Sequence, residues 1–145
     1  MTSISGTKII ALEEHYWDPG VAETFTGRNA TRSSDLLERL YDLGGLRLKE
    51  MDEAGIDVQV LSHGAPSTQR LDAETGPNVA AAANDRLYET VQSNPDRFAA
   101  FAALPTAHPR AAANELERSV TRLGFKGAMI HGLTNGAFCD GKEFW

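Results

Sequence analysis

Short apolar runs alternate with longer segments of helical periodicity along this chain, and that alternation limits its fold more than any other feature. The apolar runs lie at residues 8–12 or 8–13, 58–61, 98–104 and 125–130. Strands that alternate with helices are typical of βαβ units around a parallel sheet. The pattern fits two architectures, namely an open four-stranded sheet and the first half of a (β/α)8 barrel.

The helical segments have recognisable ends. Each begins at a capping residue or a proline and ends near a glycine or an asparagine, as helices commonly do. They span residues 34–55, with an interruption at Gly44-Gly45, 77–94 and 110–123. The first two strands are followed by long loops, 17–34 and 62–76, and loops of this length are usually functional or mobile.

Ionisable residues of the kind that bind metals stand where the first strand ends. Glu13-Glu14-His15 follows the apolar run 9–12. Because side chains alternate along a strand, Glu13 and His15 are expected on one face and Glu14 on the other. A carboxylate and an imidazole on one face are both suitable ligands for a divalent cation. The pair therefore predicts half of a metal site.

All four histidines fall just after a predicted strand. These residues are His15, His63, His108 and His131. In parallel α/β folds, binding sites are built at the carboxyl ends of the strands. For His63 and His131 the competing interpretation is a loop histidine bonded to backbone, and His108 is interpreted as a cap of the helix after Pro109.

Other residues have two interpretations. The aromatic residues Tyr16, Trp17 and Phe25 form either a wall for a planar substrate or packing within the first loop. Arg47 lies in the first helical segment and is interpreted as a solvated or helix-capping charge.

Composition and charge exclude several classes of partner. The chain of 145 residues has 14 Lys and Arg against 20 Asp and Glu, a formal net charge of -6. It has no cationic excess with which to bind nucleic acid or an anionic membrane. Cys139 is its only cysteine, and the first eight residues lack the apolar segment of a signal peptide. We therefore expect a cytoplasmic protein that acts on a small molecule.

Six segments, in this order along the chain, resemble the N-terminal half of the amidohydrolase-2 branch of the amidohydrolase superfamily. Within that branch they are most similar to non-oxidative aromatic-acid decarboxylases, such as the γ-resorcylate type. The segments are residues 11–15, 47–56, 61–66, 83–85, 95–105 and 123–128. The resemblance covers nearly the whole chain and implies a (β/α)8 barrel, of which this chain supplies about the first four βα units.

The resemblance also implies a site. It implies one divalent metal ion, Zn or Mn, with Glu13 and His15 as the ligands from the first strand. The family's remaining ligands and acid/base groups, two histidines and an aspartate after strands 5, 6 and 8, lie beyond residue 145. The family's decarboxylases often carry asparagines where this chain has His63 and His131. Both are therefore assigned to the substrate side, as catalytic candidates.

The implied reaction is non-oxidative decarboxylation of a small hydroxylated aromatic or related unsaturated carboxylic acid. The alternative is metal-assisted hydrolysis, although Glu13 stands where hydrolases of the superfamily usually have a histidine, and an anionic ligand makes metal-bound water less acidic. A third possibility is a non-catalytic half-barrel that binds a partner or itself.

The position of Trp145 adds a further expectation. It falls where the helix before strand 5 should begin. We therefore expect a truncated part of a protein roughly twice as long, and a chain that alone neither binds metal tightly nor catalyses. The resemblance separately implies a homo-oligomer, since members of the family are commonly dimers or larger.

Overall fold

Three parallel strands form the sheet at the centre of the molecule. The computed structural model describes residues 6–27 and 32–144, so Trp145 and part of the first predicted loop lie outside the described residues. The strands are β1 (Ile10–Tyr16), β2 (Val58–His63) and β3 (Phe98–Ala100), and they lie in the order β1-β2-β3. Both neighbouring pairs are parallel. The predicted βαβ organisation is therefore confirmed over these strands.

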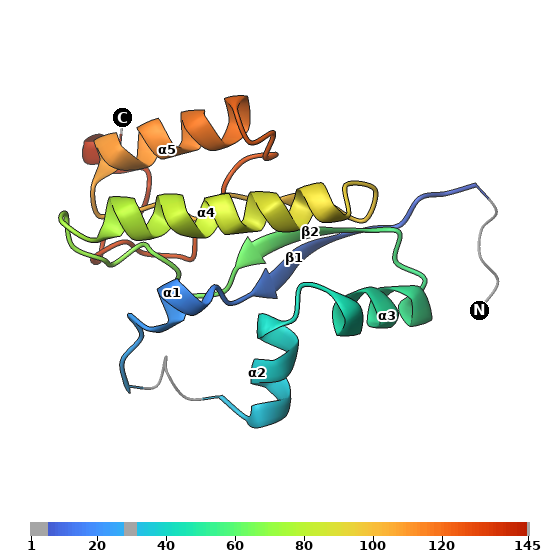
Figure 1. The fold of residues 1–145 in the computed structure, drawn as a ribbon. Helices are drawn as coiled ribbons and strands as arrows, with labels where there is room; N and C mark the ends of the chain where they lie inside the picture. The colour runs from blue at the N-terminus through green and yellow to red at the C-terminus, as the bar shows by residue number, and fades with distance from the viewer. Residues whose placement is uncertain (1–5, 28–31, 145) are drawn as a thin grey trace.

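Helices connect the strands and cover the sheet. Figure 1 shows β1 and β2 between α2 and α3 on one side and the stacked pair α4 and α5 on the other. The helices are α1 (Pro19–Ala22), α2 (Ser34–Tyr41), α3 (Gly45–Ala54), α4 (Gly76–Ser93), α5 (Pro109–Thr121) and a short 3-10 helix, η2 (Lys142–Phe144). No helix in the described part of the chain is long and apolar enough to cross a membrane.

The predicted helix ends agree closely with the structure. Gly55 ends α3 with a left-handed backbone (φ 71°), and its N–H donates to the carbonyls of Asp52 and Met51. A residue with a Cβ is disfavoured in this conformation, which explains the glycine. Pro77 lies in the first turn of α4, and Asn94 caps its other end. The interruption at Gly44-Gly45 separates α2 from α3.

The strand predictions need three corrections. First, β1 extends to Tyr16 and so contains Glu13 to His15, instead of ending at Leu12 or Glu13. Second, regular β3 pairing ends at Ala100. Third, the run 125–130 forms no regular strand among the described residues. It makes an isolated parallel bridge between Ala102 and Ala128, and the Lys126 N–H donates to the Ala100 carbonyl at the end of β3.

The main core lies between the sheet and the helices. Its buried members come from all three strands, from α3, α4 and α5, and from the segments after β3 and α5. They include Tyr16, Met51, Leu61, Leu87, Phe98 and Phe125. By contrast, Ile10 and Leu12 on β1 are 55% and 61% exposed. No described strand pairs with the outer edge of β1, so apolar side chains remain in solvent there.

Candidate metal and substrate site

A β-bulge shapes the carboxyl end of β1. The register passes from Ala11 opposite Gln59 to Glu14 opposite Leu61, so β1 holds one extra residue. Glu13, inside this bulge, has a left-handed backbone (φ 58°). Bulges often re-aim side chains next to active sites, and a non-glycine residue at positive φ stores strain. The alternation of side chains between the two faces of β1 is therefore interrupted at Glu13, the first predicted ligand.

Glu14 and His15 have different environments beyond the bulge. The carboxylate of Glu14 accepts a hydrogen bond from Nε2 of Gln59 (3.0 Å), next to helix α3. His15 instead approaches β2 and a histidine from the end of the chain: its Nδ1 lies 2.9 Å from Oγ of Ser62, and its ring centroid lies 5.3 Å from that of His131 at 64°. His15 is therefore held through Nδ1, and its Nε2 has no hydrogen-bond partner among the described residues.

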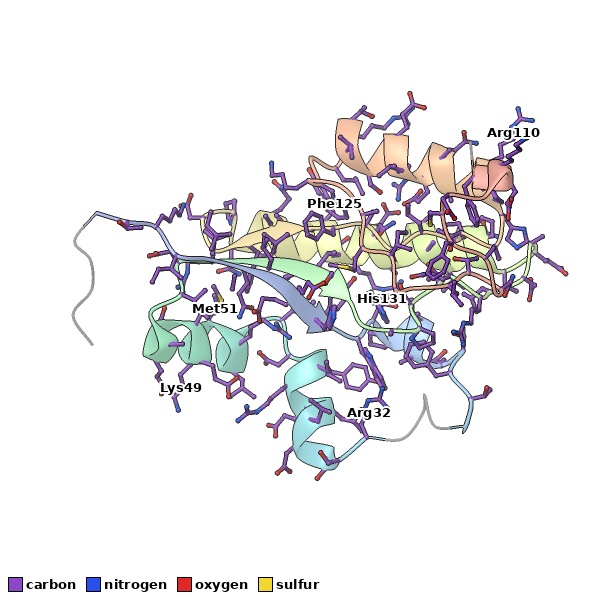
Figure 2. The ribbon with its side chains drawn as sticks, turned by 180° about the vertical axis from the view of Figure 1, so that it is seen from behind. Arg32, Lys49, Met51, Arg110, Phe125 and His131 are labelled. Atoms are coloured by element: carbon purple, nitrogen blue, oxygen red, sulfur yellow. The ribbon has the colours of Figure 1, made fainter. Side chains whose placement is uncertain are left out.

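His131 reaches this position from the segment after the run 125–130. Figure 2 shows it close to the carboxyl ends of β1 and β2. Its Nε2–H donates to the carbonyl of His63 (2.7 Å), which leaves Nδ1 as the nitrogen with a lone pair. Burial lowers the pKa of His131, and the nearby His15 lowers it further, while the His63 carbonyl and the carboxylate of Glu13 raise it. The structure thus brings Glu13, His15 and His131 into one neighbourhood.

A buried amide holds the backbone of His131. Oε1 of Gln69 accepts the His131 backbone N–H (2.5 Å), and its Nε2 donates to Oγ1 of Thr134 (3.2 Å). The Thr134 hydroxyl lies 2.6 Å from that of Thr106. Gln69 is only 1% exposed, so its amide has little access to water and needs these partners within the protein. Sequence reasoning missed Gln69, because nothing in a loop glutamine indicates such a contact.

His63 is enclosed, unlike the other two histidines. It is 2% exposed, its Nδ1–H donates to the carbonyl of Gly64 (2.8 Å), and its Nε2 accepts the backbone N–H of Asp18 (2.9 Å). Burial lowers the pKa of His63 to about 4, so the ring is neutral near pH 7. Both ring nitrogens are occupied. His63 meets the site through its carbonyl, which holds His131, and its predicted contact with substrate stays a prediction.

An ion pair lies behind His63. Nε and Nη2 of Arg86 donate to the two carboxylate oxygens of Asp18 at 2.6 and 2.7 Å, and Oδ1 also accepts the Val21 N–H at the start of α1. Burial alone would raise the pKa of Asp18, but the hydrogen bonds from Arg86 and Val21 bring it below its usual value. Sequence reasoning missed α1. The signal was present, since Asp18-Pro19 is a common helix start.

The aromatic residues near the first loop are buried, Tyr16 in the main core and Trp17 and Phe25 in a second cluster with Val21 and Ala83. Tyr16, Trp17 and Phe25 are 2%, 4% and 9% exposed. The rings of Trp17 and Phe25 meet edge to face, with centroids 5.0 Å apart. Of the two interpretations, packing is therefore correct.

His108, interpreted from the sequence as a helix cap, occupies the N-cap position of α5. Its side chain makes no capping hydrogen bond there, and its ring instead bonds the Leu71 carbonyl (3.2 Å).

Glu13 and His15 are residue types that bind divalent metals, but two ligands are too few for a complete metal site. A glutamate carboxylate and an imidazole nitrogen are suitable for Zn or Mn. No group of three or more His, Cys, Asp or Glu close enough to hold a metal ion occurs in residues 6–27 and 32–144. A metal site that uses Glu13 and His15 therefore needs further ligands from outside the described residues.

Comparison with known proteins shows which proteins this chain resembles in sequence and fold. It is 44% identical over 134 residues to a γ-resorcylate decarboxylase of Rhodococcus jostii, covering 91% of this chain and 41% of that protein. The fold also resembles a crystal structure of a dihydroxybenzoic acid decarboxylase from Polaromonas, with bound manganese and the inhibitor 2-nitroresorcinol. The TM-score is 0.83 at 37% identity, and the match covers 95% of this chain and 44% of the decarboxylase chain.

A second structure agrees with this likeness. It is that of a 5-carboxyvanillate decarboxylase from Novosphingobium aromaticivorans, which also contains manganese. Its TM-score with this chain is 0.85 at 29% identity, and the match covers 96% of this chain and 46% of the decarboxylase chain. The chain thus spans less than half the length of these relatives. The expected architecture, a partial (β/α)8 barrel, is confirmed. The family model described as Amidohydrolase (Amidohydro_2) matches residues 13–145, and the chain belongs to this family.

Proposed function

We propose that the whole protein carrying this chain is a metal-dependent decarboxylase of a small hydroxylated aromatic acid. The observation that carries the proposal is the contact between His15 and His131 at the carboxyl ends of β1 and β2, with Glu13 in the bulge two residues before His15. Named relatives support the reaction class, since they include γ-resorcylate and 5-carboxyvanillate decarboxylases. The manganese in two of the similar structures supports a divalent metal, and zinc is the other metal that this donor set suits.

In this proposal Glu13 and the Nε2 atom of His15 hold the metal, together with ligands from outside the described residues. When bound, the metal supplies a positive charge that orients the substrate carboxylate and an adjacent ring oxygen. Decarboxylation then requires a proton on the ring carbon as the bond to the carboxyl carbon breaks and CO2 leaves. The acid that delivers this proton is expected beyond residue 145.

His131 and His63 have separate roles in the proposal. His131 presents Nδ1 to the substrate side, because its Nε2–H is already donated to the His63 carbonyl. His63 holds this arrangement from behind, since both of its ring nitrogens are occupied within the protein. Of the two catalytic candidates, His131 is therefore the one proposed to contact substrate.

Two further expectations belong to the proposal. The first is a cytoplasmic location, which the composition supports. The second is a homo-oligomer. Size-exclusion chromatography with light scattering on the whole protein tests it, and a monomer at micromolar concentration would contradict it.

The reaction is tested with the whole protein, Mn²⁺ and 2,6-dihydroxybenzoate, the substrate named for a similar crystal structure. We expect release of CO2 and resorcinol in equal amounts, and loss of both after chelation of the metal. The His15→Ala variant is the control for metal dependence. Absence of CO2 from a panel of hydroxybenzoates and carboxyvanillate, with metal bound, would overturn the proposal.

A further inference from the structure

Arg47 reaches from α3 to the backbone of the proposed metal ligand. Its Nη2 donates to the His15 carbonyl at 2.9 Å. Of its two interpretations, a solvated charge is wrong and a capping charge is correct, because the guanidinium donates to the Arg39 and Asp42 carbonyls at the end of α2. The Asp42 carboxylate in turn accepts the Arg47 backbone N–H near the start of α3. Arg47 therefore connects the helix layer to the end of β1.

The end of α2 holds the guanidinium in place. Nε of Arg47 donates to the Asp42 carbonyl (2.9 Å), and Nη2 also donates to the Arg39 carbonyl (3.1 Å). The planar guanidinium carries five donors in a fixed fork, so bonds on one edge determine where the other donors point. Because the bonds to the carbonyls at the end of α2 fix the guanidinium, Nη2 also points toward the His15 carbonyl on β1.

A second branch from Arg47 reaches the residue beside His15. Nη1 donates to Oε1 of Gln59 (3.2 Å), and Nε2 of Gln59 donates to the Glu14 carboxylate (3.0 Å). Gln59 is 7% exposed, so water contributes little to this contact. One guanidinium therefore holds both residues after the bulge, His15 through its carbonyl and Glu14 through its side chain.

This support is needed because of the bulge itself. Glu13 has φ 58°, a conformation that non-glycine residues keep only when their surroundings enforce it. Fixing the His15 carbonyl fixes the direction of its Cα–Cβ bond, and the contact between Nδ1 and Ser62 then orients the ring. We infer that Arg47 is a positioning residue that keeps His15 directed toward the metal. This inference rests on the proposed function.

A conservative variant is expected to fold. Arg47 and Glu14 line a cavity of about 310 Å³ at the surface between β1, α2 and α3. Carbonyl groups that a shorter side chain leaves without a donor therefore have access to water. The Arg47→Lys variant keeps the charge but loses the fork, since a lysine ammonium cannot donate to the same four acceptors.

The experiment follows His15 by NMR in the whole protein, which carries all of the expected metal ligands. Imidazole ¹⁵N signals of the metal-free protein report the tautomer and the Nδ1 hydrogen bond of His15, and their broadening by added Mn²⁺ reports metal binding. For Arg47→Lys we expect altered His15 signals and about a tenfold lower Mn²⁺ affinity, as is typical when a group supporting a ligand is lost. Titrations are made well below the melting temperature of each variant.

Two variants serve as controls. Arg39→Lys makes the same exchange on the wall of the same cavity, at a side chain that is 63% exposed and paired with Glu50. It should leave the His15 signals and the Mn²⁺ affinity unchanged. Gln59→Met removes the branch to Glu14 but keeps the bond to the His15 carbonyl, so it should lower the affinity less than twofold.

The outcomes separate this inference from the proposed function. Unchanged His15 signals and Mn²⁺ affinity in Arg47→Lys would overturn the inference and leave the decarboxylase proposal intact. If Mn²⁺ broadens no His15 signal even in the unmodified protein, the inferred support of a metal ligand is overturned, while CO2 release still tests the reaction. An equal loss of affinity in Gln59→Met would overturn the route through the His15 carbonyl.

Discussion

His15 and His63 lie near the carboxyl ends of neighbouring strands, β1 and β2, one position out of register, and have opposite environments. His15 is opposite Ser62, and His63 is opposite Tyr16. His15 is partly exposed and has one ring nitrogen held by Ser62, whereas His63 is 2% exposed and uses both nitrogens within the protein. A strand-end position therefore does not by itself identify a ligand. A ring nitrogen left without a protein partner shows only that the histidine is available to a metal or a substrate.

His131 connects the two environments. It donates a hydrogen bond to the carbonyl of His63, and its ring lies against that of His15. Substitutions on the His15 side are therefore expected to change metal binding and activity, and changes on the His63 side to alter stability.

The largest effect is expected at the metal ligand. His15→Ala in the whole protein should lower Mn²⁺ affinity by about 100-fold or more, because it removes a ligand instead of a supporting group, and activity should fall with it. Elemental analysis after dialysis and CO2 release provide the two measurements. Glu14→Ala is the matched control and should keep most of the metal. Full metal content in His15→Ala would exclude His15 as a ligand.

The next effect is a loss of stability in acid on the His63 side. The pKa of His63 is about 4 in the folded chain against 6.5 for the unperturbed residue. The unfolded state therefore takes up a proton first, and the contribution of His63 is complete above pH 6.5 and is lost as the pH falls toward 4. At about 1.4 kcal/mol for each pH unit, the loss totals about 3 kcal/mol.

Urea unfolding between pH 7 and pH 4 measures this loss. The control is His63→Asn, which has no group to titrate and should show a shallower decline over the same range. The lowered pKa of Asp18 makes a separate contribution, present above its usual value of 3.8 and lost below it. Equal slopes for the two chains would show that His63 does not titrate as its burial indicates.

A smaller stability effect is expected from the ion pair behind His63. Arg86→Met leaves the Asp18 carboxylate, which is only 3% exposed, without its charged partner. Because Arg86 itself is 49% exposed, water screens part of the interaction, and we expect a loss of about 2 kcal/mol. Arg39→Met removes the exposed pair with Glu50 and should cost less than about 1 kcal/mol. Similar losses in both variants would remove the distinction between them.

The smallest change in stability is expected at His131. His131→Asn in the whole protein should alter the preference among hydroxybenzoates, because it replaces the proposed substrate-facing nitrogen. It should also keep full metal content and change unfolding by about 1 kcal/mol or less, since the ring is half-buried and makes one hydrogen bond to the protein. Kinetics with two hydroxybenzoates and elemental analysis test it. Loss of the metal would instead make His131 a ligand.

The sequence by itself determined the order of the elements and the ends of most helices. These features depend on local chemistry: apolar runs form the strands, Gly55 takes a left-handed backbone, and Pro77 fits a first helical turn. The place of Glu13-Glu14-His15 at a strand end was also evident locally, and the resemblance to amidohydrolases followed from motifs in order. The fourth run was overpredicted because strand pairing depends on a neighbour that local pattern does not reveal.

Only the tertiary structure decided which groups surround each histidine. The contacts of Arg47 with His15, of Gln69 with His131 and of Asp18 with His63 join residues 32, 62 and 45 positions apart. Such contacts leave no local periodicity, so a buried scaffold histidine and a candidate ligand look alike in the sequence. They differ because packing removes water from one ring and satisfies both of its nitrogens, while the other keeps a nitrogen without a partner among the described residues.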